Sequence, residues 1–157
     1  MKNGRKGDKI CIYFEEIKKE DGDILASWLE QESINKWMGG IKDWHKYFDA
    51  VKSPDYFLFK VSLDGKIIGE IGLEIIDEVG YVSFMINPDE HNKGHGKKIL
   101  KLFLENISRL IGKKIKYIEA GIDADNIASK RCFESCGFEL KEIDEDGFMD
   151  YIYNIEN

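Results

Sequence analysis

The sequence has little of what marks exported, membrane-spanning or disordered proteins. It holds only 2 prolines and 3 cysteines in 157 residues. None of its apolar runs reaches the ~18 residues of a membrane-spanning helix. The basic start is not followed by the apolar segment of a signal peptide. We therefore expect reduced thiols, a cytoplasmic protein and no membrane partner.

The sequence has fewer basic than acidic residues. Acidic residues number 30 and basic residues 23, which gives a net charge of −7. This balance argues against a nucleic-acid partner and suits a cationic one. Hydrophobic residues make up 43% of the chain, as in a folded protein. We expect a flexible tail over residues 1–8 and a single domain over residues 9–157.

The spacing of apolar residues predicts a mixed α/β fold. Successive strands at 56–63, 66–76 and 79–86 predict an antiparallel meander, and a loop and a helix over 97–111 then lead to a strand at 115–120. A helix at 126–136 and a hairpin of 138–143 with 148–154 complete the chain, after an early strand and two helical stretches. The expected fold is a mostly antiparallel, twisted sheet of about seven strands with helices on both faces.

The turn before the helix at 97–111 carries the clearest chemical signal. A helix N-terminus has unpaired N–H groups and a partial positive charge, so acidic residues usually stand there. Here glycines and basic residues stand instead, and the glycines would let a phosphate approach the backbone. The motifs of a P-loop and of a dinucleotide-binding fold are absent. The candidate anion-binding residues are His91, Asn92, Lys93, Gly94, His95, Gly96, Lys97 and Lys98.

Two motifs give the chain a resemblance to the GNAT superfamily of acyl-CoA-dependent N-acyltransferases. The stretch His91–Gly96 resembles the family signature Arg/Gln-x-x-Gly-x-Gly/Ala. Asn126, Ser129, Phe133 and Gly137-Phe138 resemble a second, later signature. The expected order of elements also resembles the GNAT fold. The region around Trp28 and Trp37 is similar to branches that acetylate aminoglycosides or protein N-termini.

The resemblance implies an N-acetyltransferase that uses acetyl-CoA and no metal. It implies that the cofactor's pyrophosphate binds the backbone of residues 92–97, with lysines 93, 97 and 98 near the phosphates. The pantetheine arm would lie along Phe84, Met85 and Ile86 and contact Asn126 and Ser129. Two residues depart from the family pattern: His91 replaces Arg or Gln, and Phe133 replaces a Tyr whose hydroxyl often protonates the leaving thiolate.

Direct acetyl transfer needs a neutral amine, a group that takes its proton, and a donor that polarises the thioester carbonyl. A backbone N–H near Met85 could be that donor. Glu70, Glu74 and Ser83 are the candidate proton acceptors; the alternative for both glutamates is that they are solvated residues on the polar face of the sheet. Trp37 is the best candidate for lining the acceptor site.

The acceptor itself stays open at this point. A small cationic amine such as an aminoglycoside or polyamine and the amine of a protein N-terminus both fit. A non-catalytic CoA-binding regulatory module is the alternative, suggested by Phe133 and by the lack of an obvious base. A homodimer formed through edge strands is also compatible with the resemblance.

Overall fold

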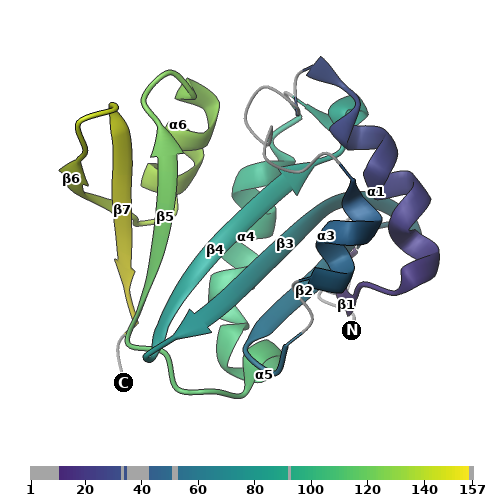
Figure 1. The fold of residues 1–157 in the computed structure, drawn as a ribbon, viewed down its shortest axis with the longest axis horizontal. Coiled ribbons are helices and arrows are strands. Elements are labelled where there is room, and N and C mark those ends of the chain that lie inside the picture. Colours follow the sequence, from purple (N-terminus) through teal and green to yellow (C-terminus); the bar gives the residue numbers. More distant parts are fainter. Residues whose placement is uncertain (1–10, 33, 35–42, 51–52, 92, 156–157) are drawn as a thin grey trace. The chain divides into compact units, whose positions relative to one another are not determined.

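The computed structural model describes residues 11–32, 34, 43–50, 53–91 and 93–155. Trp37 and Asn92 lie outside these residues. Seven strands form one sheet in the order β1-β2-β3-β4-β5-β7-β6 (Figure 1). Their bounds are β1 Ile12–Glu16, β2 Tyr56–Leu63, β3 Lys66–Ile76, β4 Val79–Ile86, β5 Tyr117–Asp123, β6 Glu139–Ile143 and β7 Phe148–Asn154.

The pairing confirms the predicted mixed, mostly antiparallel sheet. β1 pairs antiparallel with β2, and β7 pairs antiparallel with both β5 and β6. β4 and β5 are parallel, because a helical crossover connects them. The described helices are α1 Gly22–Leu29, α3 Trp44–Ala50, α4 His95–Glu105, α5 Ile107–Ile111 and α6 Ile127–Ser135, with short 3-10 helices η1 Lys19–Asp21 and η2 Pro88–Glu90.

The chain divides into two compact units. The first unit comprises residues 1–72 and 84–93, and the second comprises residues 73–83 and 94–157. In the first unit α1 and α3 lie side by side (Figure 1). Their apolar faces form a core with residues of other elements, made of Ile17, Leu25, Trp28, Leu29, Ile34, Trp44, Phe48 and Met85. The expected single domain stays a prediction.

The second unit has its own apolar core. Ile99, Leu100 and Phe103 are fully buried on α4, and their spacing of one and three residues places them on one helix face. On β5, buried residues alternate with more exposed ones, as expected for a strand with one covered face. On β7, Met149 and Tyr151 are buried in the same alternating way.

One predicted helix is wrong in its length. The helix expected over 97–111 begins two residues earlier, at His95, and is divided into α4 and α5 at Asn106. The side-chain amide of Asn106 donates to Leu102 O at 2.8 Å, and its Oδ1 accepts from Arg109. An asparagine that bonds neighbouring backbone in this way competes with the regular helical pattern. Gly112 then ends α5 with a φ of 67°, as predicted.

Among the described residues, no helix is both long and apolar enough to cross a membrane. The same part of the chain holds no group of three or more His, Cys, Asp or Glu side chains placed to bind a metal ion.

Candidate active site

No N-cap side chain accepts a hydrogen bond from the backbone N–H groups at the start of α4. The residue at the N-cap is Gly94, which has a φ of 77° and no side chain to accept a hydrogen bond. The first turn contains no acidic residue, and Lys97 and Lys98 are exposed there. The Nδ1 atom of His95 is buried and has no hydrogen-bond partner. This helix start therefore has both the donors and the charge for an anion.

The segment before this turn is fixed to the start of β3. The backbone N–H of Asn87 donates to Ile68 O at 2.8 Å, and its side-chain amide donates to Ile67 O at 3.4 Å. Its Oδ1 accepts from the N–H of Asp89 at 3.0 Å, which caps η2. The ring Nε2–H of His91 donates to Ile86 O at 3.1 Å. His91 is thus bound to the end of β4 in the first unit.

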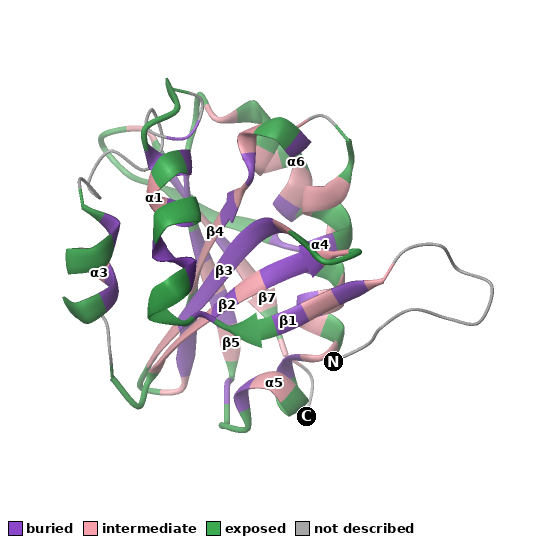
Figure 2. Ribbon diagram, turned by 90° about the vertical axis from the view of Figure 1, so that its right-hand side faces the viewer, coloured by how far each residue is buried: buried purple, intermediate pink, exposed green. Residues whose placement is uncertain are grey.

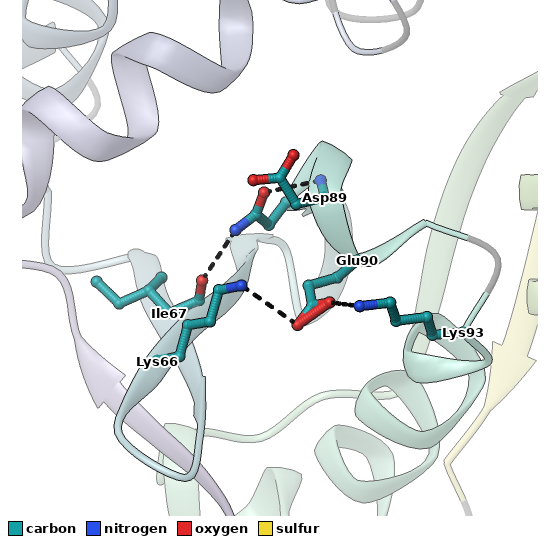
Figure 3. Close-up of polar contacts among 6 residues, drawn as sticks. Lys66, Ile67, Asp89, Glu90 and Lys93 are labelled. Atoms are coloured by element: carbon teal, nitrogen blue, oxygen red, sulfur yellow. Dashed lines mark hydrogen bonds and ion pairs between the residues drawn. The ribbon is translucent and has the colours of Figure 1, made fainter.

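Glu90 is a buried carboxylate between two lysines (Figure 3). Its Oε2 accepts from Lys93 Nζ at 2.6 Å, and its Oε1 lies 3.7 Å from Lys66 Nζ. Sequence reasoning missed this arrangement. The spacing of Glu90 and Lys93 is a visible i,i+3 pair, but no local pattern connects either residue with Lys66.

Within the second unit, the pairing of β4 with β5 ends early. The register runs from Val79 opposite Tyr117 to Tyr81 opposite Glu119, although both strands continue beyond these residues. The backbone of β4 after Tyr81 therefore has hydrogen-bonding groups that β5 does not take up in this ladder. Ser83 follows on this stretch, and its Oγ is buried without a hydrogen-bond partner.

The second predicted motif forms the start and the core face of α6. The Oδ1 of Asn126 accepts from the N–H of Ser129 at 3.2 Å, so Asn126 is the N-cap of this helix. Phe133 is buried and packs edge-on against Phe138, with ring centroids 4.9 Å apart. Gly137 has a φ of 99°, which a residue with a side chain rarely adopts. The motif has clear local roles in the fold of the second unit.

Burial also affects the two thiols on and after α6. It raises the pKa of Cys132 to about 12, and it raises the pKa of Cys136 as well. A thiol with such a pKa stays protonated near neutral pH and is a poor nucleophile. This agrees with a direct transfer that needs no covalent enzyme intermediate.

Of the candidate proton acceptors, Glu70 has the most unusual surroundings. Its side chain is on β3 in the first unit and is only 3% exposed. Figure 2 shows how extensively the middle of β3 is buried. Burial raises the pKa of Glu70 from 4.5 to about 7, and a hydrogen bond from Trp44 Nε1 at 3.2 Å lowers it in part. The alternative that Glu70 is a solvated surface residue is therefore wrong.

The other candidates are less distinctive. Glu74 is half-buried on β3 in the second unit. Phe84 and Ile86 are half-buried and Met85 is buried at the end of β4, in the first unit. Trp44 is a further functional candidate. The sequence gives no local signal for its hydrogen bond to Glu70, because the two residues are 26 positions apart.

Comparison with known proteins identifies the family. A sequence model described as an acetyltransferase (GNAT) domain matches residues 12–139. The chain is 30% identical over 143 residues to YfmK, an uncharacterized N-acetyltransferase of Bacillus subtilis (strain 168), and the match covers 88% of this chain and 94% of YfmK. The chain belongs to the GNAT acetyltransferase family. This confirms the resemblance and the predicted class of enzyme, an N-acetyltransferase.

Solved structures show the same fold. The aminoglycoside acetyltransferase AAC(6')-Ib in complex with coenzyme A matches with a TM-score of 0.77 and 18% identity, over 91% of this chain and 94% of that one. The spermidine N-acetyltransferase of Vibrio cholerae, in complex with CoA and spermine, matches with a TM-score of 0.78 and 14% identity, over 91% and 95% of the two chains. Both confirm the predicted GNAT fold.

Proposed function

We propose that this GNAT protein transfers the acetyl group of acetyl-CoA directly to a primary amine of a small cationic molecule. The observation that carries the proposal is the start of α4, where the backbone donors, Lys97 and Lys98 meet no acidic residue in the first turn. Two proteins of the same fold support the nature of both substrates, since their complexes contain coenzyme A and, in one of them, spermine. The net charge of −7 suits a cationic acceptor.

The described residues fit acetyl-CoA in three respects. The left-handed Gly94 leaves open space where a side chain would otherwise stand, since a Cβ there would meet no heavy atom within 4 Å. The unpartnered His95 Nδ1 marks an unused polar atom beside the proposed diphosphate site. The part of β4 that continues beyond its ladder with β5 is the proposed edge for the amides of a pantetheine arm.

Each group of residues proposed to bind acetyl-CoA has its own role. Backbone N–H groups of the turn at 92–97 bind the diphosphate, and Lys93, Lys97 and Lys98 add positive charge. Phe84, Met85 and Ile86 receive the arm along β4, with Asn126 and Ser129 as further contacts. When bound, acetyl-CoA supplies an acetyl thioester, which an amine can attack directly.

We propose Glu70 as the group that takes the proton of the acceptor amine. Its pKa of about 7 is suited to a general base at neutral pH. Because its carboxyl is buried, the proton reaches it through a water molecule rather than by direct contact. A backbone N–H near Met85 would polarise the thioester carbonyl, and Trp37 would line the acceptor site. Glu74 and Ser83 remain the other candidates for proton transfer.

The turn can be tested by titrating CoA into the protein in a calorimeter. In Gly94→Glu a carboxylate stands at the proposed diphosphate position, and we expect CoA affinity to fall at least about 100-fold through steric exclusion and charge repulsion. Gly112→Glu is the matched control, because Gly112 also has a positive φ and open space around its Cβ position. It introduces the same charge and similar backbone strain at the end of α5 and should leave affinity unchanged.

Equal CoA affinity of the Gly94→Glu variant and the parent would place the diphosphate elsewhere. Acetyl transfer is measured separately, as release of free CoA thiol with polyamines, aminoglycosides, amino acids and peptides as acceptors. Turnover with polyamines or aminoglycosides supports the proposed acceptor class. Turnover with peptides alone would favour a protein N-terminus, and CoA binding without any turnover would favour the non-catalytic module.

A further inference from the structure

The first unit contains a cavity that the proposed acetyl transfer does not use. It has a volume of about 410 Å³ and lies between the end of β1, α3 and the start of β2 (Figure 1). All the residues that line it belong to the first unit. This volume falls within the range of sites that bind small organic molecules. None of the lining residues is among those proposed to bind acetyl-CoA or to take the proton of the acceptor amine.

The chemistry of the lining favours an organic cation. Phe48, Tyr56, Phe57 and Phe59 contribute aromatic rings, and the charged residue of the described lining is Glu16, which is exposed. Aromatic faces and a carboxylate both attract positive charge, and the described lining includes no basic residue to oppose it. The cavity is larger than an inorganic ion needs. An ammonium group carried on an apolar body therefore suits it better.

Hydrogen bonds hold the walls of the cavity in place. The hydroxyl groups of Tyr47 and Tyr56 are 2.6 Å apart, and their hydrogen bond joins α3 to the start of β2. The backbone N–H of Ile17 donates to Leu58 O at 3.1 Å and joins the end of β1 to β2. The backbone N–H of Tyr56 donates to Ser53 O at 3.3 Å. A ligand therefore meets walls that are already ordered, which lowers the entropic cost of binding.

We propose that this cavity is a second binding site of the protein, for an organic cation such as a quaternary ammonium ion or an alkylammonium ion. The positive group lies against the carboxylate of Glu16 and an aromatic ring, and the apolar remainder of the ligand fills the cavity. This inference goes beyond the proposed function, because binding at the cavity requires neither acetyl-CoA nor turnover.

A neutral apolar ligand is the alternative occupant. It would depend on the same aromatic side chains but not on the charge of Glu16. β1 carries two neighbouring exposed glutamates, Glu15 and Glu16, and of these two Glu16 lines the cavity. Successive side chains of a strand point to opposite faces, so the two carboxylates contribute equally to the net charge but differ in their access to the cavity. Substituting each in turn separates a local contact from a general charge effect.

The experiment titrates benzyltrimethylammonium into the full chain in a calorimeter at constant ionic strength. This probe has a permanent positive charge and no N–H group, so it cannot be acetylated. We expect saturable binding to the wild type. Glu16→Gln keeps the shape of glutamate without its charge and should raise the Kd about fivefold. Glu15→Gln is the matched control and should leave the Kd within about twofold of the wild type.

A second pair of variants tests the aromatic part of the lining. Phe57→Leu removes a half-buried ring and should raise the Kd about threefold. Phe148→Leu is its control, because Phe148 is an exposed residue of the second unit, and it should leave the Kd within about twofold. Thermal melting establishes whether each variant is folded. Because Glu16 is exposed, the test of charge stands even if Phe57→Leu does not fold.

Three results would overturn the proposal. The first is the absence of saturable heat with the wild type up to about 10 mM probe. The second is a Kd for Glu16→Gln equal to that of the wild type, since the charge of Glu16 would then take no part in binding. The third is an equal loss of affinity in Glu15→Gln and Glu16→Gln. Titration of CoA into the wild type is a separate measurement, so the proposed function survives each of these results and can fail without them.

Discussion

Glu70 and Glu90 are both buried carboxyl groups of the first unit, and the charge of their neighbours differs. Glu90 faces two ammonium groups, whereas the partner of Glu70 is the neutral indole of Trp44. A full opposite charge compensates a buried carboxylate, but a single neutral donor compensates it only in part. The pKa of Glu70 accordingly rises to about 7.

The different charges around the two carboxyl groups favour different chemical behaviour. A group with a pKa near neutrality can exchange a proton during a reaction at physiological pH. A group paired with lysines is suited to organising positive charge near an anion. The contrast supports the proposed role of Glu70 in proton transfer. The same isosteric change at each site tests this assignment.

The largest expected effect is that of Glu70→Gln on catalysis. Glutamine still accepts a hydrogen bond from Trp44 but cannot take a proton, so we expect kcat to fall about 100-fold or more. The affinity for CoA should stay within twofold of the parent, because Glu70 has no proposed contact with the cofactor. Steady-state kinetics with saturating amine and acetyl-CoA measure the change. An unchanged kcat would mean that Glu70 is a buried structural residue and takes no part in proton transfer.

Much of this arrangement could be predicted from the sequence, because hydrophobic spacing is a local signal. The bounds expected for β2 and β3 agree with the structure, and the meander, the hairpin and the glycine turn are all present. The break at Asn106 was not expected, since the apolar residues keep their helical spacing across it. That break depends on how one side-chain amide bonds.

The surroundings of the two glutamates could not be predicted in the same way. Residues 68–73 of β3 are buried without alternation, so the rule that every second residue faces solvent fails for Glu70. Lys66 meets Glu90 because β3 and β4 are neighbouring strands and Asn87, after β4, is bound to the start of β3. Contacts between residues far apart in the sequence determine both environments. Such contacts cannot be predicted from a short sequence pattern.

Folding stability gives a second comparison, in which the same substitution acts in opposite directions. The pKa of Glu70 is higher in the folded protein than its ordinary value of 4.5, so folding favours the protonated form. Its ionisation costs no folding stability below pH 4.5. The cost grows between pH 4.5 and 7 and reaches about 3 kcal/mol above pH 7.

Glu70→Gln should therefore raise the free energy of unfolding at pH 8 by about 3 kcal/mol and change it little at pH 4. Glu90→Gln should lower it by about 1 kcal/mol at pH 8, because both lysines lose their charged partner. Urea unfolding at the two pH values measures both effects. Equal changes of the same sign in the two variants would contradict the contrast between the two sites.

The smallest expected effect concerns the indole of Trp44. Its N–H stabilises the ionised form of Glu70, so Trp44→Phe should raise the pKa of Glu70 further. If Glu70 takes the proton of the amine, the acidic limb of the pH profile of kcat should move up by about one pH unit. Trp28→Phe is the matched control, because Trp28 is buried in the same core and loses a similar volume. The Trp28→Phe control should lower the free energy of unfolding without moving the pH profile of kcat. If both variants moved the profile equally, Trp44 would have no specific effect on proton transfer by Glu70.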